Sequence, residues 1–87
     1  MIYVDILRTD YDGNQEEILR FSLEDDKIVA ENLNGSTIDY KDLLEEDKYI
    51  IGLRAKKISI NDGMEFLKNL KYAFSGSILR ATEIIRG

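Results

Sequence analysis

The segment from Ser59 to Gly76 constrains the fold most, because it has the marks of one amphipathic helix with a defined start and end. Ser59 is followed three residues later by Asp62. Such a pair is typical of a helix N-terminus, where side-chain oxygens accept hydrogen bonds from free backbone N–H groups. Apolar residues then recur at steps of three and four, which predicts one face packed on a core. They are Ile60, Met64, Leu67, Leu70 and Phe74.

Two glycines mark the ends of this helix. Gly63 lies in the first turn and costs about 1 kcal/mol relative to alanine, so we expect another backbone segment to pack closely against it. Gly76 predicts the end of the helix, because glycine adopts positive φ without a steric cost. A strand is expected over 77–85, and its inward face is predicted to carry Leu79, Ala81 and Ile85.

The pattern DG-x2-FL-x2-L-x3-F-x-GS-x-LRAT, which runs from Asp62 to Thr82, resembles a motif in small prokaryotic proteins of unknown function. The motif covers about a quarter of the chain. Similar proteins favour proline in the first turn of the helix, where this chain has Ile60. The resemblance implies a shared compact fold, and it assigns no activity, cofactor or binding residue.

The first third of the chain predicts three antiparallel strands joined by tight turns. Alternation of apolar residues predicts strands over 2–8 and 16–23, and a shorter strand over 27–31. Asp12-Gly13 is expected to form the positive-φ pair of the first turn, and Glu24-Asp25-Asp26 the second turn. In the second strand, the predicted inward residues are Leu19, Phe21 and Leu23, and the predicted outward residues are Ile18, Arg20 and Ser22.

The middle of the chain predicts a loop over 32–37 and then a short helix. The cap of this helix is either Ser36 with Asp39 or Asp39 with Asp42. Its apolar edge is expected to consist of Ile38, Leu43 and Leu44. Residues 49–53 read equally as a short edge strand or as a buried linker.

These elements predict one compact α+β domain over residues 1–87, with a mainly antiparallel four-stranded sheet. The expected order is β-β-β-α-α-β, with both helices packed on one face of the sheet. A chain of 87 residues buries roughly 60 to 65% of its unfolded surface, which is enough for a core without disulfides or a structural metal.

The chain has no Cys and no His, which excludes thiol nucleophiles, imidazole bases and the usual zinc sites. A carboxylate site for Ca²⁺ or Mg²⁺ is the remaining option for a metal. Asp10, Asp12, Asn14 and Glu16 have the alternating spacing of calcium ligands. A calcium loop needs glycine at its sixth position, however, whereas Gly13 is the fourth residue counted from Asp10, and the flanking segments predict strands. We therefore expect no catalytic residue, no cofactor and no metal.

Charge is divided unevenly along the chain. Residues 1–47 hold 14 acidic and 4 basic residues, a net charge of −10, whereas residues 48–87 hold 3 and 8, a net charge of +5. This division predicts an interaction surface in the second half, made of Tyr49, Ile50, Ile51, Arg54, Lys56, Lys57, Lys68 and Lys71. A backbone anion nest is a further candidate at Ser75, Gly76 and Ser77, with Arg80 close in sequence.

The function expected from these features is that of a small non-enzymatic protein-interaction or self-assembly module. The alternatives are an accessory nucleic-acid-binding protein that uses the basic residues of the second half, and a carboxylate-metal enzyme. Pairing of the acidic run Asp39–Asp47 with the basic run Arg54–Lys71 would give a homodimer, while a monomer that buries 49–51 remains equally open. The apolar runs are too short to cross a membrane, and MIYVDILR lacks the features of a signal peptide. A cytoplasmic location is therefore expected.

Overall fold

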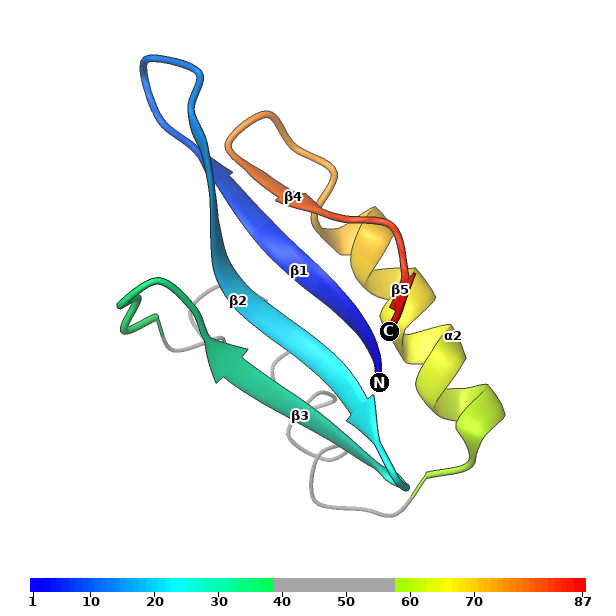
Figure 1. The fold of residues 1–87 in the computed structure, drawn as a ribbon. Helices are drawn as coiled ribbons and strands as arrows, with labels where there is room; N and C mark the ends of the chain where they lie inside the picture. Colours follow the sequence, from blue (N-terminus) through cyan, green and yellow to red (C-terminus); the bar gives the residue numbers. More distant parts are fainter. Residues whose placement is uncertain (39–57) are drawn as a thin grey trace.

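The structure, a computed structural model, describes residues 1–38 and 58–87 and shows an antiparallel sheet with one helix against it (Figure 1). The elements are β1 (Ile2–Thr9), β2 (Gln15–Glu24), β3 (Lys27–Asn32), α2 (Ile60–Ala73), β4 (Leu79–Ala81) and β5 (Ile85–Arg86). The strand order is β3-β2-β1-β4, and β5 also pairs with β1. The predicted α+β class and the antiparallel sheet are confirmed.

The element order differs from the prediction. Within the described residues it is βββαββ with one helix, in place of β-β-β-α-α-β. The predicted short helix around Leu43 and Leu44, and the segment 49–53, lie outside the described residues. The single strand expected over 77–85 is wrong, because the chain forms two short strands, β4 and β5, separated by residues 82–84.

The segment between β4 and β5 contains one residue more than the part of β1 that lies opposite it. Ile6 pairs with Ala81 and Tyr3 pairs with Ile85, so two residues of β1 lie opposite three residues, 82–84. Thr82 fills the irregularity, since its hydroxyl accepts a hydrogen bond from the backbone N–H of Asp5 (3.0 Å) and its own N–H donates to the Asp5 carbonyl (2.9 Å). A bulge reverses the alternation of side chains. The core side is therefore taken by Ile84, and Ile85, which we predicted to point inward, is exposed.

A second register shift lies between β1 and β2. Ile6 pairs with Leu19 and Leu7 pairs with Glu17, which leaves Ile18 without a register partner on β1. Ile18 and Leu19 are both buried, each with 1% exposure. The prediction that Ile18 points outward is therefore wrong, because the bulge interrupts the period of two.

Ser22 was also predicted to point outward, and it is buried as well. It occupies the central part of the sheet, where its register partners are Tyr3 on β1 and Val29 on β3. A small side chain between two larger neighbours is shielded even on the face that does not contact the helix.

The first hairpin turn differs in detail from the prediction. Gly13 has φ of 85°, whereas Asp12 is not at positive φ. The backbone N–H of Asp10 donates to Asn14, and the N–H of Gly13 donates back to Asp10 (3.0 and 3.1 Å), the pattern of a three-residue loop with glycine in the left-handed position. In the second turn, Asp25 takes a φ of 55°.

Helix α2 begins as predicted. Ser59 has an extended backbone, and its Oγ accepts a hydrogen bond from the N–H of Asp62 at 3.1 Å. Gly63 is closely packed, but a Cβ there would lie 2.7 Å from a Leu23 side-chain carbon and not against another backbone segment. The end of the helix differs from the prediction, since the N–H of Phe74 donates to Leu70 and Gly76 does not adopt positive φ.

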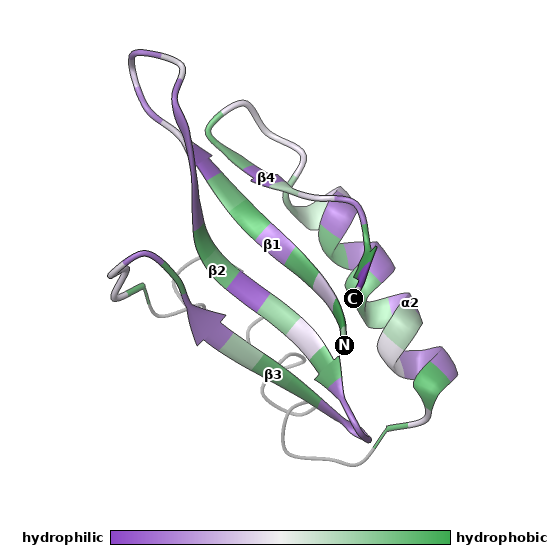
Figure 2. Cartoon of the chain, in the orientation of Figure 1, coloured by the Kyte–Doolittle hydropathy of each residue, from purple (hydrophilic) through white to green (hydrophobic). Residues whose placement is uncertain are grey.

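The core lies between the sheet and one face of α2, where Figure 2 shows apolar residues along the strands and on the helix. Leu67, Leu70 and Phe74 are buried as predicted, and Met64 is partly buried against the core. Ile60 was expected in the same row but is 62% exposed, because it lies at the first residue of α2, beyond the sheet edge of the core. Phe66 was not predicted, and its ring packs edge-on against Phe21 at 6.1 Å.

Candidate functional site

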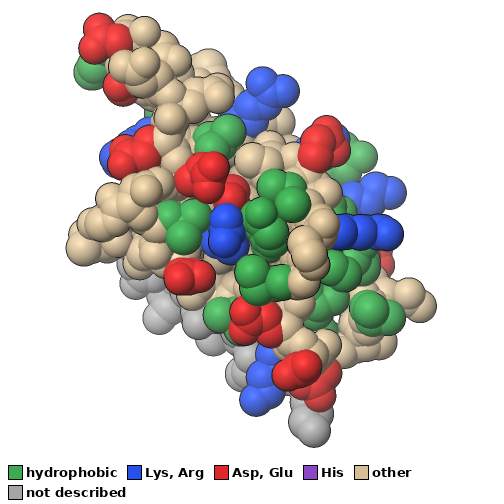
Figure 3. Space-filling view, in the orientation of Figure 1, with side chains coloured by type: hydrophobic (Ala, Val, Ile, Leu, Met, Phe, Trp, Pro, Cys, Tyr) green, Lys and Arg blue, Asp and Glu red, His purple; other side chains and the backbone are tan. Residues whose placement is uncertain are grey.

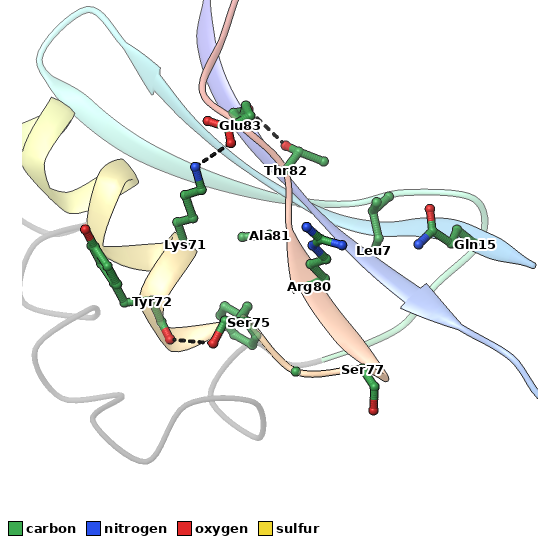
Figure 4. A pocket seen from close by; sticks show the side chains of 12 residues that line it. Leu7, Gln15, Lys71, Tyr72, Ser75, Ser77, Arg80, Ala81, Thr82 and Glu83 are labelled. Carbon is green, nitrogen blue, oxygen red and sulfur yellow. Dashed lines mark hydrogen bonds and ion pairs between the residues drawn. The ribbon is translucent and has the colours of Figure 1, made fainter. Parts of the chain in front are cut away.

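A large hollow lies between the C-terminal end of α2 and strand β4 (Figure 4). It has a volume of about 920 Å³. Lys71 and Tyr72 line it from α2, the loop 75–77 and Arg80 line it from the following segment, and Leu7 and Gln15 extend it towards the first hairpin. The loop is held in place because the N–H of Ala81 donates to the Phe74 carbonyl at 2.7 Å and Ser75 bridges Arg80.

The charged groups of this hollow differ in their partners. Lys71 forms an ion pair with Glu83, which Figure 4 shows beside Thr82. Arg80 forms no ion pair or side-chain hydrogen bond with any described residue. In the adjoining loop, the backbone N–H groups of Ser77 and Ile78 likewise donate to no described residue. Ser77 and Arg80 both line the hollow, which therefore offers an anionic group one guanidinium and one backbone N–H without a partner among the described residues.

Two smaller hollows continue along α2 from the large one. One is lined by Met64, Lys68, Tyr72 and Ile84, and the other by Lys68, Tyr72 and Glu83 among its residues. Tyr72 lines all three hollows and is 72% exposed. We call this continuous surface the α2 groove, and define it by Met64, Lys68, Lys71, Tyr72, Arg80, Glu83 and Ile84.

The structure brings together part of the predicted site. The four residues of the anion-nest prediction, Ser75, Gly76, Ser77 and Arg80, all line the large hollow. Of the predicted interaction surface, Lys68 and Lys71 lie on the α2 groove. The remaining residues of that surface, Tyr49, Ile50, Ile51, Arg54, Lys56 and Lys57, lie outside the described residues, as does the acidic run Asp39–Asp47.

Sequence reasoning missed Glu83 and Ile84 as groove residues. Their position depends on the bulge after Ala81, which turns Ile84 towards the helix. A strand pattern read as continuous alternation contains no signal for this shift, although the adjacent Thr82, a residue able to hydrogen-bond a backbone N–H, is a weak one.

A polar cluster occupies the opposite face of the sheet. The side chain of Asp5 is only 3% exposed, and Arg20 donates to both of its oxygens, from Nε at 2.7 Å and from Nη2 at 3.0 Å. The guanidinium also stacks on Tyr3, 4.0 Å from the ring centre. Figure 3 shows Lys or Arg and Asp or Glu side chains side by side at the centre of this face. Because Arg20 occupies both Asp5 oxygens, the cluster is suited to holding β1 and β2 together and leaves little room for catalysis.

Glu17 lies at the edge of this cluster, and its Oε2 is 3.9 Å from Arg20. A hydrogen bond with Asp5 raises the pKa of Glu17 most, and burial and the charge of Asp5 raise it further, while the Arg20 charge opposes them. A carboxyl with a raised pKa in the folded state stabilises the fold when protonated, and that stabilisation is lost as pH rises through the folded pKa.

Replacing Glu17 with glutamine therefore gives an expected change with pH. The variant stays neutral, so its melting temperature relative to the parent should rise between about pH 4 and about pH 7. Because Glu17 is 49% exposed, the change should be small. Thermal unfolding of both proteins across that range measures it, and a relative melting temperature that falls with pH would contradict the assignment.

Two of the alternating carboxylates of the first turn, those of Asp10 and Glu16, have partners within the hairpin. One oxygen of Asp10 accepts hydrogen bonds from the backbone N–H groups of Asp12 and Asn14, each at 2.9 Å, and Glu16 pairs with Arg8. Over residues 1–38 and 58–87, no three acidic side chains gather in a way that could hold a metal ion.

Comparisons with protein-family models, with curated proteins and with solved structures found no match for this chain. The resemblance of Asp62–Thr82 to small prokaryotic proteins therefore stays a prediction. In the part of the chain that the structure describes, no helix has the length and apolar character to cross a bilayer.

Proposed function

We propose that the protein is a small non-enzymatic interaction module that binds a protein partner in the α2 groove. The observation that carries the proposal is the exposure of Tyr72, which lines every hollow of the groove. Tyrosine is enriched among the residues that dominate binding at protein interfaces, because its ring offers a large contact area and its hydroxyl can still hydrogen-bond.

The surroundings of Tyr72 support the same proposal. Met64 and Ile84 contribute partly buried apolar surface, and Lys68 and Lys71 lie beside them. An apolar centre with a polar rim is the usual anatomy of a protein interface.

The charge of the groove favours a protein partner over a nucleic acid. Glu65 and Glu83 line the same hollows as Lys68 and Lys71, and Glu83 is paired with Lys71. These acidic groups lower the positive potential that binding to a polyanion requires.

Selection of displayed peptides on the immobilised protein tests the proposal. A selected peptide titrated into ¹⁵N-labelled protein should shift the amide signals of α2 and of residues 75–84. Tyr72→Ala should weaken the binding by about tenfold or more, with little loss of stability because the side chain is exposed.

The matched control is Tyr11→Ala, because Tyr11 is likewise an exposed tyrosine but lies outside the groove. This variant should bind the peptide like the parent. Signal changes confined to other surfaces, or unchanged affinity in Tyr72→Ala, would show that the groove is not the binding surface.

A further inference from the structure

The tip of the β1–β2 hairpin carries an aromatic ring and a carboxylate that nothing in the described chain uses. Tyr11 has a relative exposure of 110%. The Asp12 side chain forms no ion pair or hydrogen bond with a described residue, whereas Asp10 is occupied by the turn. The hairpin is held to its neighbour as far as Thr9, whose N–H donates to the Ile78 carbonyl at 2.9 Å, and its tip projects beyond the sheet (Figure 1).

The α2 groove offers the complementary groups. Arg80 lacks an acidic partner among the described residues, and Ser77, whose backbone N–H donates to no described residue, lines the same hollow. The hollow of about 920 Å³ at this end of the groove has Tyr72 on its wall. One chain thus carries a free carboxylate next to an exposed ring, and a free guanidinium next to a hollow.

The net charges of the two surfaces also have opposite sign. Residues 10–17 contain Asp10, Asp12, Glu16 and Glu17 and no basic residue, a net charge of −4. The charged residues that line the large hollow are Lys71, Arg80 and Glu83, which gives 2 − 1 = +1. Figure 3 shows acidic side chains at the projecting hairpin and Lys or Arg side chains along the edge beside α2 and β4.

We infer that the α2 groove binds the hairpin tip of a second copy of this chain. The carboxylate of Asp12 in one copy lies against Arg80 of the other, and the ring of Tyr11 enters the hollow beside Tyr72. This inference rests on the proposed function, because it names the partner of that groove.

A two-fold arrangement uses both surfaces of each copy. Because every chain carries one hairpin and one groove, an isologous pair satisfies both contacts at once and closes without forming a filament. The opposite charges speed association, and salt should weaken it, since exposed charges are screened over about 8–10 Å at moderate ionic strength.

A charge-swap experiment tests the inference in the full chain. Asp12→Arg and Arg80→Glu are both exposed substitutions, and circular dichroism checks that each variant folds. By sedimentation velocity up to about 1 mM, a range that reaches weak association, each variant alone should show a dimer Kd raised about tenfold or more. Each homodimer would place like charges together twice.

An equimolar mixture of the two variants should regain the association of the parent. In the mixed pair, Arg at position 12 meets Glu at position 80 in one contact, and the other contact keeps the parental Asp12 and Arg80. Tyr11→Ala should also weaken association, because it removes the ring that enters the hollow of the second copy.

Two results would overturn the inference. One is a parent protein that remains monomeric at every concentration up to about 1 mM. The other is a mixture that associates no better than the separate variants. If the parent is monomeric and yet a selected peptide binds in a Tyr72-dependent way, the occupant is a different protein and the proposed function stands; if that binding is absent too, both proposals are wrong.

Discussion

Truncation of Leu67 or Leu70 to alanine is expected to lower the free energy of unfolding by about 2–5 kcal/mol per substitution. Leu67 has no exposed surface and Leu70 is 3% exposed, and both belong to the apolar cluster between α2 and the sheet. Removal of either side chain loses the free energy gained by burying it and leaves a cavity. The surrounding strands are held by their own hydrogen bonds and therefore close this cavity only partly.

Thermal and urea unfolding measure this loss. For a domain of this size, 1 kcal/mol corresponds to about 4–8 °C, so each variant should melt at least about 8 °C below the parent. Additivity is not expected for the double variant, since the two residues lie one turn apart and share one cavity.

Ile60→Ala is the matched control on the same helix. Ile60 is similar in size to leucine, but most of its surface is exposed. Its truncation should change stability by no more than about 0.5 kcal/mol. If Leu67→Ala and Leu70→Ala melt like Ile60→Ala, the helix does not pack on the sheet as described.

The start of α2 was predictable because its signal is local. The Ser59 hydroxyl lies three residues from the N–H that it caps, so the residues that form this hydrogen bond are also those that predict the start of the helix. The same holds for the hairpin turns, where Gly13 and Asp25 take positive φ within short polar segments.

The two bulges were not predictable, because they depend on which strands pair and in which register. Ile18 looks like an outward residue in any strict alternation, and its burial follows only from the extra residue opposite β1. Likewise, Ile84 rather than Ile85 reaches the core because the chain gains a residue between β4 and β5. The alternation of residues along a strand predicts the face of each side chain only where the pairing with the neighbouring strand is regular.

The candidate site was predictable in its charges and not in its shape. Lys68, Lys71 and Arg80 stand out in a sequence whose basic residues lie mostly in its second half. Their meeting with Ile84 and with the loop after Phe74 depends on the packing of β4 beside β1. Residues separated in sequence form one groove only through this tertiary arrangement.

Asp5 is the residue for which the difference between the predicted and the observed environment has the largest expected effect on stability. Alternation alone treats it as a polar side chain on the outer face of a strand. The structure gives it 3% side-chain exposure and a two-point hydrogen bond from Arg20, across the β1–β2 pair. A carboxylate so removed from water depends on the guanidinium that replaces its hydration.

Arg20→Met is therefore expected to destabilise the protein by about 3–5 kcal/mol, because it leaves the Asp5 carboxylate buried without a counter-charge. Methionine is an unbranched side chain of similar length, so it limits the loss of volume, but it also gives up the stacking of the guanidinium on Tyr3. The stability of Arg20→Lys should lie between that of the parent and that of Arg20→Met, since lysine restores the charge but cannot donate to both oxygens in the same plane. Urea unfolding of the three proteins measures the order.

The double variant Asp5→Val with Arg20→Met tests whether the unpaired Asp5 carboxylate causes the loss of stability in Arg20→Met. If the cost in Arg20→Met comes from the unpaired carboxylate, then removal of that carboxylate should return most of the lost stability, because a buried ion pair can often be replaced by apolar residues at little net cost. A double variant less stable than Arg20→Met would show that the Asp5 side chain stabilises the sheet by itself. Recovery would instead mean that Asp5 and Arg20 stabilise the β1–β2 pairing only together, each compensating the desolvation of the other.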